Sequence, residues 1–304
     1  MSSINIPVIS LRWAFHVARW QPSPLQWRRA CAGLDPEEVE RISQFQYQSD
    51  AKASLVGQIM FRRAAWDSLH GLFQDIHCLR SPKGKPQVVC DGVIPLWFDA
   101  NVAHQGDWVV LAAEFVNPQD QVRVGVDVMR LNDQRGDINR FFHLMKRKFT
   151  PLEWVMIRNP KDSQCCSAEE QLRMFYRYWA LKESFVKADG LGLGWNLQKI
   201  QFHITSPLPS CDSLHPVQDT CVQVLGAADE TSKWTFQELI LKDGQHCMSV
   251  AIKNDNTRNV SSTITRYVED FEDLIPVEFE DELSEETWDD NWKKFCQMQV
   301  NKDV

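Results

Sequence analysis

Residues 176–195 read YRYWALKESFVKADGLGLGW, and they are the most informative part of this chain. The first half has the composition of a helix, and the second half contains glycines at 190, 192 and 194. On a helix, Glu183 and Lys187 would lie four residues apart and share one face. A functional acid–base pair would fit this spacing. An ordinary surface ion pair followed by a glycine stop would also fit it, so the rest of the chain must decide.

The composition indicates a globular protein of one large domain or two fused smaller ones. The chain has 304 residues, of which 43% are hydrophobic, and it contains 12 tryptophans. No apolar run reaches the roughly 18 residues of a membrane span, and the N-terminus lacks a secretory pattern. Nine cysteines without metal-ligand spacing are typical of a reducing compartment. We therefore expect a cytoplasmic protein with no membrane partner.

The net charge of −8 is unevenly distributed along the chain. Residues 267–304 hold thirteen acidic and three basic side chains, a net of −10, which leaves the remaining body at about +2. A mildly basic body suits an anionic ligand but falls far short of a nucleic-acid binder, so no nucleic-acid partner is expected. The aromatic residues of the acidic tail predict that part of it packs on the body, away from any ligand-binding cleft.

The pattern of elements favours an α+β fold with antiparallel strands. Capping boxes predict helices that begin after Asp35, Thr150 and Ser167, each with an acid three residues further on. Alternating residues over 12–20 predict a strand, and Asp243-Gly244 predicts a hairpin turn. Helices and strands alternate irregularly, which argues against a doubly wound parallel sheet.

Two single residues are candidates for chemistry. Asp127 lies in the apolar stretch GVDVM, and a buried acid is costly unless it is paired or bound to a metal. A hydrogen-bonded Asp at a sheet edge would explain it as well. His104 lies in the predicted polar turn of NVAHQGD, where a structural role is the commoner one.

Two loops bear on ligand binding. The stretch LRSPKGKP places Arg80, Lys83 and Lys85 around a glycine, an arrangement that can wrap phosphates but is also typical of a solvated basic turn. The glycine loop after the helix is no dinucleotide fingerprint, because it does not link a strand to a helix. This context argues against an oxidoreductase that uses a dinucleotide.

Three motifs in order resemble a known family. GVDVM, FTPLEW and WALKESFVKADGLGLGW resemble the signature of the Sfp-type 4′-phosphopantetheinyl transferases, with 56 residues between Asp127 and Glu183. SPKGKP and NVAHQGD are similar to upstream coenzyme A-binding segments of that family, and RISQF…SDAK to its N-terminal one. The resemblance covers about residues 12–253 and is strongest to the eukaryotic aminoadipate-semialdehyde dehydrogenase type.

The resemblance implies an architecture. It predicts two similar fused lobes, a pseudo-dimer within a monomer, with coenzyme A in the cleft between them. The lobes would span residues 1–122 and 123–256, and residues 257–304 would form the acidic tail.

The resemblance also implies an activity, a holo-[acyl-carrier-protein] synthase. Such an enzyme moves 4′-phosphopantetheine from coenzyme A to a serine of apo-acyl or peptidyl carrier proteins and releases adenosine 3′,5′-bisphosphate. Carriers in fatty acid synthase, aminoadipate reductase or other enzymes would be the partners. A coenzyme A-binding regulator or scaffold without transferase activity is the alternative, against which the intact Asp127, Glu183 and Lys187 argue.

Residue roles follow from the same resemblance. Asp127 and Glu183 would bind Mg²⁺, and Glu183 would also serve as base, directly or through a metal-bound water. Lys187 would neutralise the leaving group, and His104 would lie near the pyrophosphate. The residues expected to contact coenzyme A are Arg41, Arg80, Ser81, Pro82, Lys83, Gly84, Lys85, Asn101, Val102, Ala103, His104, Asp127, Glu183 and Lys187.

Met129 and Glu153 bear on how closely this chain follows the family pattern. Many family members carry a third carboxylate where this chain has Met129, so a water is expected in its place. Glu153 belongs to the second motif, but its capping-box position favours a structural role.

Overall fold

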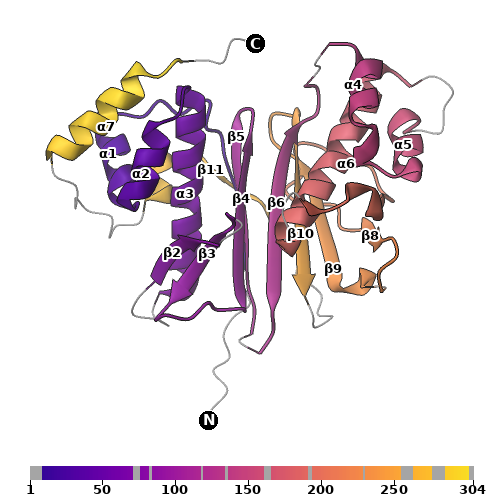
Figure 1. Cartoon of the computed structure of the whole chain (residues 1–304), viewed down its shortest axis with the longest axis horizontal. Helices are drawn as coiled ribbons and strands as arrows, with labels where there is room; N and C mark the ends of the chain where they lie inside the picture. Colours follow the sequence, from indigo (N-terminus) through magenta and orange to yellow (C-terminus); the bar gives the residue numbers. More distant parts are fainter. Residues whose placement is uncertain are drawn as a thin grey trace.

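Two mainly antiparallel sheets stand side by side at the centre of the molecule, and helices cover their outer faces (Figure 1). The computed structural model describes residues 9–70, 76–81, 84–117, 119–133, 136–160, 166–190, 194–228, 230–254, 263–275 and 285–300. The mixed helix and sheet content confirms the α+β class. None of the helices in these ranges combines the length and apolar character that crossing a bilayer requires.

The first sheet has the strand order β11-β1-β5-β4. Its strands are β1 (Ile9–Phe15), β4 (Phe98–Gln105), β5 (Trp108–Phe115) and β11 (Arg266–Val268). The long helix α3 (Gln48–Leu69) packs against β4 and β5. Around it lie α1 (Pro24–Ala32), α2 (Pro36–Ser43), α7 (Glu285–Gln297) and the hairpin of β2 (Ile76–Arg80) and β3 (Pro86–Cys90).

The second sheet has the order β6-β10-β9. Its strands are β6 (Val122–Arg130), β9 (Trp234–Ile240) and β10 (His246–Asn254). The helix α6 (Ala168–Asp189) lies across β6 and β10. The remaining elements of this half are α4 (Ile138–Leu144), η1 (Lys146–Lys148), α5 (Pro151–Arg158), η3 (Leu197–Lys199), β7 (Ile200–His203), β8 (Cys221–Val224) and η4 (Thr231–Lys233).

Side chains of β4, rather than a backbone ladder, hold the two sheets together. Asp99, Asn101 and Gln105 lie on one face of β4 and accept hydrogen bonds from the backbone N–H groups of Val124, Val126 and Arg130. The three distances are 2.7, 3.0 and 2.7 Å. The edge of β6 is thereby satisfied without strand pairing.

Local signals in the sequence were borne out in part. The capping boxes at Thr150 and Ser167 and the hairpin between β9 and β10 are confirmed. The expected strand over 12–20 is wrong in its second half, because the chain turns after Phe15. At Asp35 the helix does begin, but the side chain makes no capping bond. Its carboxylate instead pairs with Arg62 of α3 at 3.1 Å, a tertiary partner that outcompetes the local one.

The acidic tail packs back on the body, as its aromatic residues predicted. Phe271 of η5 (Phe271–Leu274) stacks on Trp20 with ring centroids 4.1 Å apart, and Phe295 of α7 stacks on Trp27 at the same distance. β11 pairs in parallel with β1. The tail is thus part of the first sheet and of its helical cover.

Candidate active site

The helix α6 approaches β6 closely because position 125 is a glycine. A Cβ atom there would lie 2.0 Å from the carbonyl oxygen of Ser184 and 2.4 Å from the backbone nitrogen of Ala188. No side chain fits in that space. The motif glycine therefore sets the height of α6 above the strand that carries Asp127.

The close approach brings Lys187 onto Asp127. The Nζ atom of Lys187 lies 2.6 Å from Oδ1 of Asp127 and donates a second hydrogen bond to the carbonyl oxygen of Val126 at 3.0 Å. The other carboxylate oxygen of Asp127, Oδ2, is buried and has no hydrogen-bond partner among the described residues. A buried acceptor without a donor suits a cation ligand.

Glu183 lies near enough to Asp127 for the two charges to interact. Burial raises the pKa of Glu183, the charge of Asp127 raises it further, and Lys187 and Lys148 oppose both effects. Burial likewise raises the pKa of Asp127, against the effect of Lys187. Two adjacent carboxyl groups that both resist ionisation gain from a shared divalent cation, so the residues present fit Mg²⁺.

Glu183 and Lys187 line a cleft of about 470 Å³, whereas Asp127 is not among its lining residues and contacts Lys187 behind the cleft wall. The cleft lies where α6 of the second half faces α2, α3 and β4 of the first. Its lining residues are Arg41, Phe45, Ala53, Ser54, Gly57, Gln58, Phe61, Arg80, Gly84, Lys85, Pro86, Asn101, Val102, His104, Glu183, Val186, Lys187 and Gly190. Most of the residues that the sequence nominated for coenzyme A thus meet in one place.

The far wall of the cleft is positively charged. Burial lowers the pKa of Arg41, the neighbouring guanidinium of Arg80 lowers it further, and Glu38 acts in the opposite sense. Arg41 donates to Oγ of Ser54 at 3.3 Å, and Arg80 donates to the carbonyl oxygen of Gly84 at 3.0 Å. Two adjacent guanidinium groups in a cleft favour an anionic ligand.

Some of the residues that the sequence predicts to bind coenzyme A also make structural contacts. The Nζ atom of Lys85 pairs with Oδ2 of Asp99 and donates to the carbonyl oxygen of Val124, so this lysine ties the β2–β3 hairpin to β6 even though it lines the cleft. Asn101 holds the N–H of Val126.

Other nominated residues do not line the cleft. Ala103 is buried in the apolar layer between the sheets and does not line the cleft. Ser81 shapes the basic turn, where its Oγ accepts the N–H of Lys85 at 3.0 Å. Pro82 and Lys83 lie outside the described residues. His104 lies within β4 rather than in a turn, and its exposed side chain lines the cleft.

Glu153 has the structural role that its position favoured. It is 1% exposed, and it accepts the backbone N–H groups of Thr150 and Phe202 at 2.8 and 3.0 Å. It also pairs at 2.8 Å with Lys182, which is completely buried. Lys182 in turn donates to the carbonyl oxygens of Leu197 and Ile200. Lys182, the lysine of the motif Lys182-Glu183-Ser184, therefore links α6 to α5 and to the segment from η3 to β7.

The α3 side of the cleft was not predicted from the sequence. Ser54, Gln58 and Phe61 line it, and their spacing of four and three residues places them on one helical face. That spacing was the available signal. A Cβ atom on Gly57 would lie 3.0 Å from Cγ1 of Val102, so a second glycine allows this helix to lie close to β4.

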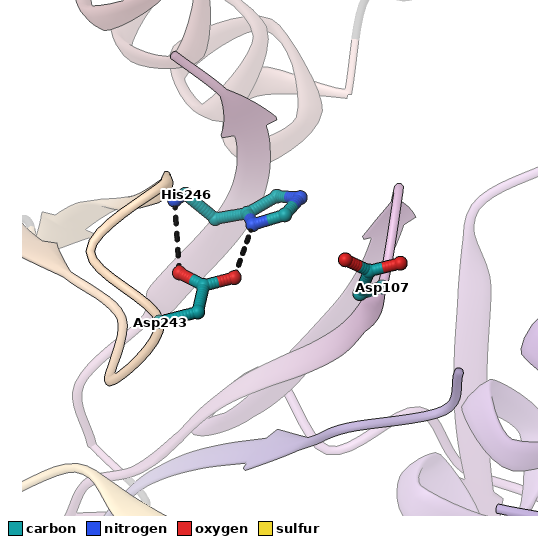
Figure 2. A group of neighbouring side chains, drawn as sticks. All are labelled: Asp107, Asp243 and His246. Atoms are coloured by element: carbon teal, nitrogen blue, oxygen red, sulfur yellow. Dashed lines mark hydrogen bonds and ion pairs between the residues drawn. The ribbon is translucent and has the colours of Figure 1, made fainter. Parts of the chain in front are cut away.

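A second group of potential metal ligands lies between two hairpin turns, away from the cleft residues. Ligand atoms of Asp107, Asp243 and His246 lie within 4.8 Å of one another (Figure 2). Both oxygens of Asp243 already accept hydrogen bonds, among them His246 Nδ1 at 2.6 Å and Trp108 Nε1 at 2.8 Å. A Cβ atom on Gly106 would lie 2.5 Å from Nε2 of His246, so the glycine covers that nitrogen. These residues are therefore better explained as a structural hydrogen-bonded contact between the two turns than as a metal centre.

Another cavity, of about 520 Å³, is somewhat larger than this cleft. Trp195, Trp234 and Lys253 are among its lining residues, and none of the residues expected to bind coenzyme A lines it. The chemistry-bearing residues therefore point to the smaller cleft.

Comparison with known proteins gives two family matches. Residues 18–116 match "4′-phosphopantetheinyl transferase, N-terminal", and residues 123–251 match the "4′-phosphopantetheinyl transferase superfamily". The chain is 42% identical over 252 residues to the L-aminoadipate-semialdehyde dehydrogenase-phosphopantetheinyl transferase of Mus musculus, covering 82% of this chain and 77% of the relative. The Xenopus laevis protein of that name is 37% identical over 286 residues, covering 90% and 89%. The 4′-phosphopantetheinyl transferase of Bacillus subtilis is 28% identical over 188 residues, covering 60% and 74%.

Proposed function

The chain belongs to the 4′-phosphopantetheinyl transferase superfamily and is a phosphopantetheinyl transferase, and we propose how its cleft performs the reaction. Coenzyme A lies in the cleft between two lobes, and the acceptor is a serine of an apo-carrier protein. The observation that carries this proposal is that Glu183 and Lys187 line one cavity with Arg41 and Arg80, while Lys187 is paired with the buried Asp127 behind it. A regulator or scaffold without activity finds no support among the named relatives.

The nucleotide end of coenzyme A binds at the positive wall. Arg41 and Arg80 hold its 3′-phosphate, because their neighbouring charges favour a dianion between them. His104 lies further along β4 and contacts the pyrophosphate. This orientation points the phosphopantetheine toward Glu183.

Asp127 and Glu183 hold Mg²⁺, which neutralises the pyrophosphate charge when it is bound. The buried, unbonded Oδ2 of Asp127 supports this assignment. The serine Oγ forms a bond to the β-phosphorus of coenzyme A while the bond from that phosphorus to the bridging oxygen breaks. Glu183 accepts the serine proton. Lys187 supplies positive charge for the departing adenosine 3′,5′-bisphosphate.

The carrier protein approaches over α4, η1 and α5. This surface combines the basic run Lys146–Lys148 with exposed apolar side chains, of which Leu144, Leu152 and Val155 are 72%, 58% and 57% exposed. Lys148 is near enough to Glu183 to lower its pKa, so the surface borders the site. Basic and apolar groups together suit an acidic carrier domain.

Two broader features of the proposal concern the cell. We place the enzyme in the cytoplasm, since the eight cysteines with described environments are all free thiols, and we propose that it acts as a monomer. The carriers are domains of fatty acid synthase, aminoadipate reductase or similar enzymes; the names of the mouse and frog relatives refer to the second kind.

A mass measurement tests the proposal. The protein is incubated with coenzyme A, Mg²⁺ and an apo-carrier, and the carrier should gain one phosphopantetheine. Glu183→Gln, which keeps the shape but removes a charge and the base, should slow the transfer by at least about 10²-fold. No mass gain with any of several apo-carriers would overturn the proposal, and an active Glu183→Gln variant would overturn the role of that residue.

A further inference from the structure

The last described residues of the chain contact the segment that carries the cleft wall. Gln299 lies beside the connector between α2 and α3, with a bridge between Tyr47 and Gln299. The N–H of Gln48 donates to the carbonyl oxygen of Gln299 at 2.9 Å, and the N–H of Gln299 donates to the carbonyl oxygen of Gln46 at 3.0 Å. Two residues about 250 positions apart are thus joined by backbone hydrogen bonds.

This contact serves as the N-terminal cap of α3. The N-cap residue of that helix is Tyr47, whose side chain makes no capping hydrogen bond. The first N–H of a helix has no partner within the helix, and a side chain usually satisfies it or one of its neighbours. Here the carbonyl oxygen of Gln299 accepts the N–H of Gln48, so the C-terminal segment supplies the missing acceptor.

Side-chain packing holds the cap in place. Phe295 is 4% exposed and stacks on Trp27, and Met298 is 9% exposed. On α2, Glu40 pairs with Lys294 at 3.1 Å, at the residue next to Arg41. Figure 1 shows α7 lying across the outer side of α1 and α2. None of the described residues of α7 lines the cleft.

The elements that the C-terminal segment fixes are those that form the positive wall. Arg41 lies on α2, Phe45 lies in the connector, and Ser54 and Gln58 lie in the second and third turns of α3. Ser54 accepts the hydrogen bond of Arg41 across the two helices. A helix whose first turn frays would loosen this bond.

We propose that residues 285–300 position the α2–α3 wall and thereby set the affinity for coenzyme A, without contributing to the chemical step. The inference rests on the proposed binding of the nucleotide at Arg41 and Arg80. It makes the acidic tail an internal support of the binding cleft.

Two variants test this. A chain that ends after residue 284 removes α7 but keeps β11 and η5. Gln299→Pro keeps the capping carbonyl but deletes both groups that hold it in place against Gln46, the N–H and the side-chain Oε1, and it lies beyond the end of α7, where proline is tolerated. Val300→Pro is the matched control, because it places the same residue one position on, where the side chain is 66% exposed and the N–H makes no described hydrogen bond.

The dissociation constant for coenzyme A is measured by calorimetry without a carrier. It should rise by about two- to thirtyfold in both test variants, the range spanned by the loss of one helix cap. The control should bind as the parent does, and kcat at saturating coenzyme A should stay within about twofold in all three variants. Unchanged affinity in both test variants would overturn the proposal.

Hydrogen exchange gives a readout that needs no ligand. The amides of Gln48 and the next two residues should exchange faster in both test variants and not in Val300→Pro. If exchange is unchanged in both test variants, the cap does not exist in solution and the proposal fails. If exchange accelerates while the intact chain binds no coenzyme A, the capping stands, and the failure belongs to the proposed function.

Discussion

Gly125→Ala should separate the catalytic residues of α6 from Asp127. The new Cβ atom would start 2.0 Å from the carbonyl oxygen of Ser184, whereas Cβ contacts shorter than 3.0 Å essentially never occur. The helix must therefore move by at least about 1 Å, because both neighbouring atoms belong to its backbone and cannot rotate away. Overpacking of this kind costs about 1–3 kcal/mol of the free energy of unfolding.

The larger effect should be on catalysis. A displacement of about 1 Å in a catalytic group can reduce the rate by roughly 10²-fold. We expect kcat of phosphopantetheine transfer to fall by that order while the protein stays folded, as measured by steady-state kinetics well below its melting temperature. The control is Val250→Ala on β10, which removes buried apolar volume from the layer on the other side of the sheet. It should lower stability by a similar amount and leave kcat near the parent value. A Gly125→Ala enzyme with parental kcat would refute the argument that the close approach places the catalytic pair.

Three further expectations follow from the site. Arg41→Ala should raise KM for coenzyme A by about 10- to 100-fold, the equivalent of one charge-assisted hydrogen bond, while Arg29→Ala on the outer surface should leave KM unchanged. With dephospho-coenzyme A, which lacks the 3′-phosphate, the difference in KM between Arg41→Ala and the parent enzyme should be smaller. An equally large difference would show that Arg41 does not bind the 3′-phosphate. Burial raises the pKa of both Asp127 and Glu183, and both carboxyl groups must be ionised to hold Mg²⁺ as proposed. The rate of transfer should therefore fall as pH is lowered, and the fall should begin at a higher pH than the ordinary pKa of a carboxyl group would give. A higher Mg²⁺ concentration should move this fall to lower pH. An acid limb that ignores Mg²⁺ would contradict the shared metal site. Gly106→Ala should lower the melting temperature, because the φ of +59° at this position is strained for alanine and the new Cβ atom would clash with Nε2 of His246. An unchanged melting temperature would show that the side chains drawn in Figure 2 can shift at little cost in stability.

The sequence by itself determined the features that depend on neighbouring residues. The capping boxes at Thr150 and Ser167 and the hairpin at Asp243-Gly244 were predictable, because a cap or a tight turn is formed by residues within four positions of one another. The spacing of Glu183 and Lys187 on one helical face is local in the same sense. The family could also be predicted from the sequence, because its motifs are short and occur in a fixed order along the chain.

Only the tertiary structure decided what the polar side chains between distant segments do. Asp35 was expected to cap its helix but pairs with Arg62, Lys182 of the KES motif supports Glu153, and Lys85 braces β6 through Asp99. In each pair at least one side chain is largely buried, with Arg62 9%, Lys182 0% and Asp99 17% exposed, and an unpaired charge at such a position would be costly. The cap that Gln299 places on α3 has the same origin: no pattern in residues 44–48 indicates that the missing acceptor arrives from the other end of the chain.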